Sequence, residues 1–487
     1  MLKKAKRLLY LFHRWLGVAL CVWFALLFAS GIIMMYVEYP ELTEDERLWQ
    51  LDVVNPAAVH ISAADAARIA GADDYSSIKL ATVVGRPAYQ LSDAYGSLHT
   101  VFADDGSVFA GLQPDTALTA ARHSMFAGTG STPRYDALIN IDQWTVSSVL
   151  DASRPLHRVA LDDEAGTVLY ISDTNGQVVR DSNRVERFWN WLGSTIHWIY
   201  PWQFRQHVSL WTDVLTYLSL AGVFSVISGA VIGWWRLRVK KRYRSENMTP
   251  YSGWQKWHHV MGLGFVLFIS TWIFSGLMSM FPWGIFDNAT SADDQLARYY
   301  GGAIDRFDSF PEPNSALLQT GDVKEVEWRR IGDARYLVLS RSSTDKRVVL
   351  ADDNADADAD ALRVLVSAAI PALQPQAHIE QQRVITQYDS WYYSHHNRYR
   401  PLPVLEVRFD DAEQSWYHID LTSGAVVQRL TNTDRWARWL YNGLHSFDFA
   451  PLFQLRPLWD ATLILLLLCG LAFSLTAVVI GWRRVRA

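Results

Sequence analysis

Four long apolar runs interrupt the polar sequence, at residues 8–36, 214–235, 258–281 and 461–482. At about 1.5 Å per residue, a helix over each run is long enough to cross about 30 Å of hydrocarbon. The first run is too long for a signal-peptide core and precedes no small-residue cleavage site, so we expect it to remain as an anchor. The pattern therefore predicts four membrane-spanning helices, and the lipid bilayer is the first partner that it implies.

The basic residues predict the orientation of these helices. Lys and Arg cluster before the first run, between the second and third runs, and after the fourth. The positive-inside rule places these clusters in the cytoplasm, which makes both termini cytoplasmic and the two large segments periplasmic in a bacterial inner membrane. The expected order is a cytoplasmic start with the first helix (1–36), a periplasmic module (37–213), the second helix (214–235), a basic loop (236–257), the third helix (258–281), a second periplasmic module (282–460), and the fourth helix with a basic tail (461–487).

The external segments have the pattern of an α+β fold. Residues 62–70 have helix-forming composition behind a serine cap, and strand-like alternation follows, as in 86–91. The expected fold class is an α-helical integral membrane protein with four transmembrane helices and α+β periplasmic modules.

The chain also repeats itself at a nearly constant offset. Residues 12–17 align with 257–262, which lie 245 positions later, and 232–234 align with 480–482, which lie 248 positions later. This small drift indicates a tandem duplication. Because both halves start in the cytoplasm, the repeats are parallel and their pseudo-two-fold axis runs along the membrane normal. Equivalent residues should then share the same depth in the bilayer.

Composition excludes several functional classes. With Lys+Arg 45 against Asp+Glu 50, the net charge of -5 gives no support for a nucleic-acid partner. The two cysteines, Cys21 and Cys469, lie in apolar runs, so neither a disulfide framework nor a cysteine-based metal site is expected. Metal chemistry would have to use the 14 histidines.

Several motifs together resemble a known family. His-Arg-Trp-Leu-Gly at 13–17, Trp-His-His-Val-Met-Gly at 257–262, and the segments 439–449 and 456–460 are similar to the PepSY-associated transmembrane helix family, over nearly the whole chain. The resemblance implies PepSY-like modules facing the periplasm. It is closest to the branch of inner-membrane ferrisiderophore reductases, which carry b-type hemes between their helices and release iron as Fe(II).

Four histidines form two pairs related by the repeat. His13 pairs with His258 near the cytoplasmic face, and His197 pairs with His445 near the periplasmic face. Two imidazoles at equal depth that face a common axis can supply both axial ligands of a heme, an arrangement suited to electron transfer. The pairs therefore predict two hemes, one above the other, and the resemblance implies that they are b-type. Hydrogen bonding at the membrane surface is the alternative explanation for the cytoplasmic pair.

Other residues are candidates for supporting roles. Gly17 and Gly262 each lie one turn beyond a paired histidine, where a missing side chain admits a flat macrocycle or a close helix. His259 is a substitute ligand, although it should point about 100° away from His258. His207 either assists the outer heme or caps an interface, and we favour the interface. The candidate acceptor surface comprises Trp198, Trp202, Trp391 and Arg400, with His395 and His396 as weaker candidates.

The expected function is electron transfer from the inner heme to the outer heme and on to a ferric siderophore or another ferric chelate. The sequence has no dinucleotide-binding motif, so a quinol or a cytoplasmic reductase must donate the electrons. The alternative is a non-enzymatic anchored PepSY module that binds or regulates a periplasmic partner. A homodimer is left open. A transporter is disfavoured because the helices carry no broken-helix signature.

Overall fold

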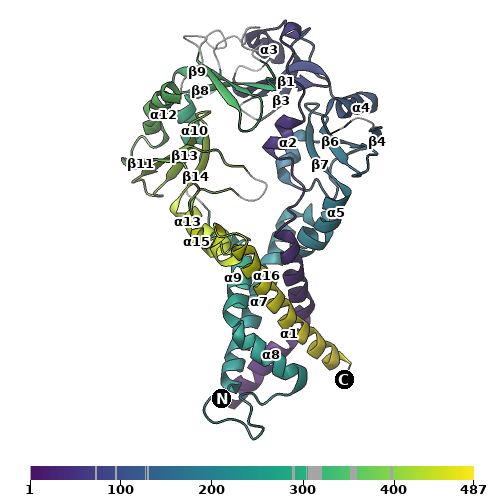
Figure 1. Cartoon of the computed structure of the whole chain (residues 1–487), viewed down its shortest axis with the longest axis vertical. Helices are drawn as coiled ribbons and strands as arrows, with labels where there is room; N and C mark the ends of the chain where they lie inside the picture. The colour runs from purple at the N-terminus through teal and green to yellow at the C-terminus, as the bar shows by residue number, and fades with distance from the viewer. Residues whose placement is uncertain are drawn as a thin grey trace. The chain divides into compact units, whose positions relative to one another are not determined.

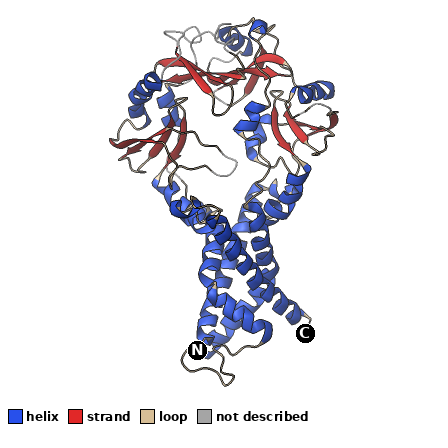
Figure 2. Ribbon diagram, in the orientation of Figure 1, coloured by secondary structure: helices blue, strands red, loops and turns tan. Residues whose placement is uncertain are grey.

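The computed structural model describes residues 2–486 apart from 72–73, 94–95, 127, 129–130, 288–290, 303, 305–320, 351–358 and 395–398. The chain forms two compact units. The described strands all belong to the second unit, whereas the first is built from helices (Figure 1, Figure 2). The first unit comprises Met1–Tyr39, Glu186–Asp287 and Thr433–Ala487, and the second comprises Pro40–Val185 and Asn288–Asn432.

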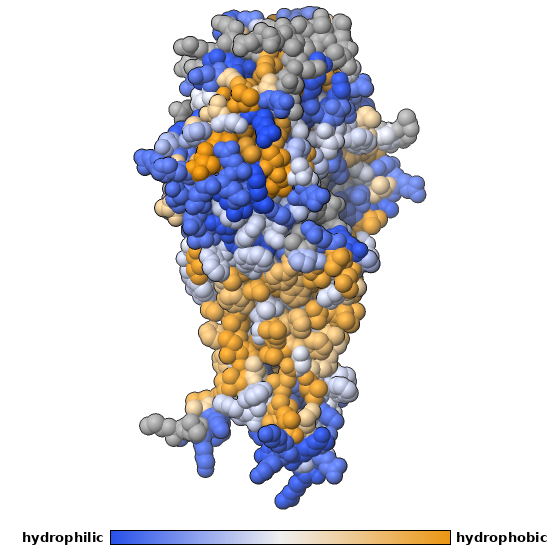
Figure 3. Space-filling view, turned by 60° about the vertical axis from the view of Figure 1, so that its left-hand side comes forward, coloured by the Kyte–Doolittle hydropathy of each residue, from blue (hydrophilic) through white to orange (hydrophobic). Residues whose placement is uncertain are grey.

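Three helices of the first unit are long and apolar enough to cross a membrane: α1 (Leu2–Met34), α7 (Val208–Arg236) and α16 (Leu458–Val485). Helix α1 packs against both α16 and α7. The two chain termini lie at the same end of this unit (Figure 1). A broad band of hydrophobic side chains covers its helices, and hydrophilic side chains gather at the end with the termini (Figure 3). The expected combination of membrane helices with an α+β part is confirmed.

The third apolar run does not form one continuous helix. Helices α8 (Gly253–Gly264) and α9 (Val266–Met278) meet at an angle of 72°, and together they make a fourth candidate span. The expectation of an unbroken helix over 258–281, on which a transporter was disfavoured, is therefore wrong. Gly262 and Gly264 disfavour helix just before the bend, and Phe265 leaves the helical region with φ -110 and ψ 10.

Short helical segments flank the spans of the first unit. Two are π-helical, η3 (Trp191–Thr195) and η6 (Trp439–Gly443), and each continues from an α-helix, α5 (Arg184–Asn190) and α13 (Asn432–Arg438) respectively. The remaining segments are α6 (Trp202–Arg205), η4 (Pro282–Gly284), α14 (Leu444–Ser446) and α15 (Ala450–Phe453).

A six-stranded antiparallel sheet joins both halves of the sequence in the second unit, with the order β10-β9-β8-β1-β2-β3. Strands β1 and β8 pair at its centre, where Leu80 lies opposite Val326. In the core of this sheet, Tyr89 packs edge-to-face against Trp328 with ring centroids 5.7 Å apart. The strands are β1 (Tyr75–Val83), β2 (Arg86–Asp93), β3 (Leu98–Phe102), β8 (Glu325–Ile331), β9 (Ala334–Ser340) and β10 (Lys346–Leu350).

Each half also contributes a four-stranded antiparallel sheet in sequential order. The first contains β4 (Arg134–Ile139), β5 (Leu156–Ala160), β6 (Val168–Ser172) and β7 (Val178–Ser182). The second contains β11 (Ile379–Ile385), β12 (Val404–Phe409), β13 (Trp416–Asp420) and β14 (Val426–Leu430). Both halves thus place three strands, a helix and four strands in the same order. The helices of this unit are α2 (Glu44–Trp49), η1 (Pro56–Ala58), α3 (Ala63–Ala70), α4 (Pro114–His123), η2 (Ser148–Ser153), α10 (Asp293–Tyr300) and α12 (Ala359–Leu373).

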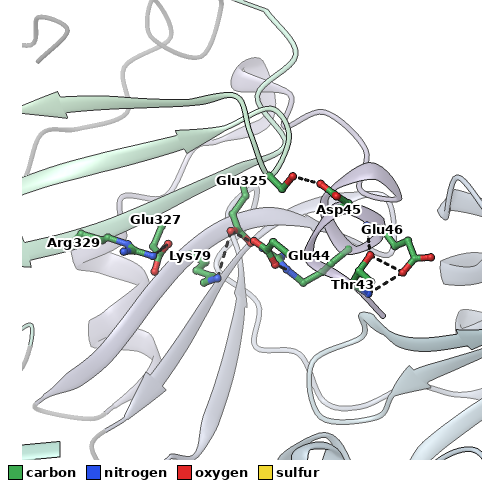
Figure 4. Close-up of polar contacts among 10 residues, drawn as sticks. Thr43, Glu44, Asp45, Glu46, Lys79, Glu325, Glu327 and Arg329 are labelled. Carbon is green, nitrogen blue, oxygen red and sulfur yellow. Dashed lines mark hydrogen bonds and ion pairs between the residues drawn. The ribbon is translucent and has the colours of Figure 1, made fainter. Parts of the chain in front are cut away.

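A buried ion-pair cluster links the two halves beside this six-stranded sheet (Figure 4). Glu325 at the start of β8 is 3% exposed and accepts hydrogen bonds from Arg47 of α2 at 2.7 and 2.9 Å. Lys79 of β1 lies 3.4 Å from the same carboxylate. Burial alone would raise the pKa of Glu325, but the charges of Lys79 and Arg47 outweigh burial and lower the pKa from 4.5 to about 2.

Candidate functional site

His197 and His445 come together in the first unit. Their ring centroids are 6.2 Å apart and their planes are nearly perpendicular, at 87°. Each histidine lies two residues beyond a π-helix, η3 or η6, and π-helical turns are often found at functional sites. If both Nε2 atoms pointed at one metal ion, two metal–nitrogen bonds of about 2 Å would account for about 4 Å of this separation. The remaining distance of about 2 Å would cover the two steps from nitrogen to ring centroid. In that orientation, the spacing suits one metal ion between the two rings.

A buried serine contacts each imidazole of His197 and His445, which we call the outer pair. The Nδ1 of His197 lies 3.0 Å from Ser30 Oγ, and the Nδ1 of His445 lies 2.9 Å from Ser275 Oγ. Each hydroxyl donates its single hydrogen to a carbonyl of its own helix, Ser30 at 2.6 Å and Ser275 at 3.0 Å. The serine oxygens are then acceptors for the imidazoles. This pattern favours a proton on Nδ1 of both histidines, which would leave the lone pair of Nε2 for a ligand.

The histidines of the cytoplasmic pair have similar contacts at Nδ1, with different partners. The Nδ1 of His13 lies 3.1 Å from the Ser225 carbonyl oxygen and 3.2 Å from Ser228 Oγ. A carbonyl can only accept, so His13 Nδ1 is the donor. The Nδ1 of His258 lies 3.0 Å from Thr476 Oγ1, whose hydroxyl donates to a carbonyl of its own helix at 2.6 Å. In this tautomer, the Nε2 of each of the four paired histidines carries a lone pair.

The four hydroxyls follow the same repeat as the histidines. Ser275 lies 245 positions after Ser30, and Thr476 lies 248 positions after Ser228. Ligating histidines usually donate their second N–H to a fixed acceptor, which sets the ring orientation. Sequence reasoning gave no role to Ser30 and Ser275, and it missed Ser228 and Thr476. The offset of 248 was the signal that could have found them.

A cavity of about 720 Å³ adjoins the cytoplasmic pair and is lined by both His13 and His258. This volume lies within the range of small-molecule sites. Gly17 borders open space, since a Cβ there would meet nothing within 4 Å. Gly262 instead faces a side chain, because its Cβ would come 2.9 Å from the ring of Phe473, on which His258 stacks at 4.7 Å.

His259 and His207, the two other histidines considered as ligands, make different contacts from the paired histidines. His259 is buried, and its Nε2 donates to the Gly233 carbonyl at 2.9 Å, which links α8 to α7. Its ring also packs edge-to-face with Tyr251. His207 is exposed and directly precedes α7, where its carbonyl accepts from the Trp211 amide at 2.9 Å.

The residues of the expected acceptor surface divide between the two units. Trp198 packs against Tyr200 at 5.5 Å, and Trp202 begins α6, both in the first unit. Trp391 packs edge-to-face with an indole of β13, and Arg400 lies over a tyrosine ring, both in the second unit. A joint surface stays a prediction. His395 and His396 lie outside the described residues.

A model of the family described as PepSY-associated TM region matches residues 10–484. No curated protein matches the chain.

Proposed function

Because the chain belongs to the PepSY-associated TM region family, we propose that it is a b-type di-heme oxidoreductase of the bacterial inner membrane. It passes electrons to a ferric acceptor in the periplasm. The single observation that carries this proposal is the state of the four paired histidines. Each has a hydrogen-bond partner at Nδ1, which would leave Nε2 available to bind iron.

The topology is part of the same proposal. Both termini and the basic loop at 236–257 face the cytoplasm, and the modules at 37–213 and 282–460 face the periplasm. The common end of the two termini and the positive-inside rule support this orientation. The shared order of strands in the two halves supports a tandem duplication with its axis along the membrane normal.

His13 and His258 would hold the inner heme, and His197 and His445 the outer one. A bound heme would supply one-electron Fe(III)/Fe(II) chemistry at these imidazoles. Among the described residues, no group of three or more His, Cys, Asp or Glu gathers that could hold a metal ion. Two imidazoles fall short of a protein zinc site, whereas porphyrin brings four further ligands.

The lining of the inner cavity also suits a heme. Gly17 leaves space for a flat ring, although Gly262 serves a contact with Phe473. Among the described residues that line the cavity, Arg14, Arg483 and Arg484 are charged and none is acidic. Guanidinium groups pair well with carboxylates, so this lining favours a planar ligand that carries acid groups.

The proposed acceptor is a ferrisiderophore. Fe(III) is a hard acid held tightly by oxygen ligands, and adding one electron weakens those bonds, so Fe(II) leaves while the chelator stays intact. Trp198 and Trp202, in the first unit, are proposed docking residues, and Trp391 and Arg400, in the second unit, stay separate candidates. A quinol or a cytoplasmic reductase supplies the electrons.

Spectroscopy of the purified full-length chain tests the proposal. We expect protein from heme-replete cells to show a Soret band and a reduced α band. His13→Ala and His445→Ala should each lose about half of the absorbance, since each removes a ligand from one of two pairs. The exposed His207→Ala is the control and should lose none. Ferric hydroxamate should then reoxidise the dithionite-reduced protein. Colourless protein would instead favour an anchored module without redox activity.

A further inference from the structure

Two residues after each outer histidine, the backbone adopts a left-handed conformation. Ile199 and Phe447 lie two residues beyond His197 and His445 and have φ of 47° and 52°. This region is rare for non-glycine residues and especially for a β-branched one such as isoleucine. Such backbone persists only where surrounding contacts hold it, and it clusters at functional sites. The two halves of the chain therefore share a strained turn directly beyond the proposed ligand.

An indole from the next spanning helix holds each turn. Trp211, in the first turn of α7, donates its Nε1–H to the Trp198 carbonyl at 2.9 Å. Trp459, in the first turn of α16, donates to the Ser446 carbonyl at 3.1 Å. Both carbonyls belong to the residue directly after the histidine. Carbonyls at a helix end have no partner within the helix, so the indoles supply the missing donor.

Each outer histidine is thus tied to both spans of its own half. A serine of α1 or α9 holds the imidazole, and a tryptophan of α7 or α16 holds the backbone. We propose that Trp211 and Trp459 are positioning residues that fix the depth and direction of His197 and His445. The inference rests on the proposed di-heme function and adds to it the residues that build the outer ligand pair.

The second half has one additional contact. Trp272 donates its Nε1–H to the carbonyl of His445 itself at 2.7 Å. The position 245 residues earlier is Leu27, which has no polar side-chain group to donate. His445 is therefore held by two indoles and His197 by one. Loss of the Trp211 donor should disturb the outer pair more than loss of the Trp459 donor.

The test replaces each indole with a ring that cannot donate. Trp211→Phe and Trp459→Phe keep an aromatic side chain and remove the N–H. Trp234→Phe and Trp482→Phe are matched controls on the same two helices, where the side chains are 72% and 59% exposed. All variants are made in the full-length chain and purified both with heme and, from heme-deficient cells, without it.

Two readouts are measured. In heme-free protein, hydrogen exchange should become faster in Trp211→Phe at the amides of Trp198 and Tyr200, which bond to Ser194 and Thr195 at 3.0 and 2.8 Å. In heme-loaded protein, the outer pair should retain heme roughly 10-fold less tightly. A loss of this size is typical when a group that hydrogen-bonds to a metal ligand is removed. The inner pair and both controls should not change.

Unchanged exchange together with unchanged heme retention would overturn the positioning role. Equal damage to both pairs would also overturn it, because it would indicate general misfolding rather than an effect on one pair. If the unaltered chain binds no heme, the proposed function fails, and the exchange measurement alone still decides whether the indoles hold the turns.

Discussion

A hydroxyl group lies beside the Nδ1 of each paired histidine, and each of these contacts can be tested by substitution. In Ser275→Ala, the Nδ1–H of His445 loses its acceptor, so the imidazole becomes a less basic ligand and stabilises Fe(III) less. We expect the reduction potential of the outer heme to rise by roughly 40 mV, the equivalent of about 1 kcal/mol for one hydrogen bond. A spectroelectrochemical titration measures this shift.

Ser270→Ala is the matched control for this prediction. Ser270 lies on the same helix and donates to the Val266 carbonyl at 2.6 Å. Its loss should leave both potentials unchanged. Equal shifts in the two serine variants would show that the hydroxyl of Ser275 does not act through His445.

Sequence alone could pair the histidines but could not describe their contacts. The near-constant repeat offset in the sequence gave the pairs. The 6.2 Å between His197 and His445 depends on how the helices pack, which no local pattern encodes. Ser228 was missed because a single hydroxyl in an apolar helix commonly bonds its own backbone, as it also does here at 2.9 Å.

At the scale of elements, Glu325 connects β8 with α2 and β1. Glu325→Gln would leave Arg47 and Lys79 near one another without their buried counter-charge. We expect a loss of about 3 kcal/mol at pH 7, from a pKa lowered from 4.5 to about 2. Because the folded pKa is the lower one, this contribution is fully present above pH 4.5 and disappears as the pH falls toward 2. The difference between variant and parent should therefore shrink over that range.

Thermal unfolding of the second unit, followed by circular dichroism at several pH values, measures this effect. Glu44→Gln is the control, because Glu44 also pairs with Arg47 at 2.7 Å but is 48% exposed. An exposed pair contributes little. If the two variants unfold alike at pH 7, the buried cluster does not stabilise the unit.

Element types were more predictable than their pairing. The four apolar runs and the alternating segments did become helices and strands. The pairing of residues 78–81 with 325–328 was not foreseen, because strands so far apart in sequence find their register through a shared core. The bend between α8 and α9 was also missed, although Gly262 and Gly264 precede it.

At the scale of the whole molecule, the proposed function requires two hemes between the spanning helices, each bound by a pair of imidazoles. The perpendicular rings of the outer pair make a specific spectroscopic prediction. Axial imidazole planes at right angles bring two iron d orbitals close in energy, so a ferric heme there should give a highly anisotropic low-spin signal.

Low-temperature electron paramagnetic resonance of the oxidised, full-length protein is the most direct test. The account predicts this anisotropic low-spin signal, its loss in His197→Ala, and its retention in His207→Ala. A spectrum without any ferric heme signal, or one that His197→Ala leaves unchanged, would contradict it.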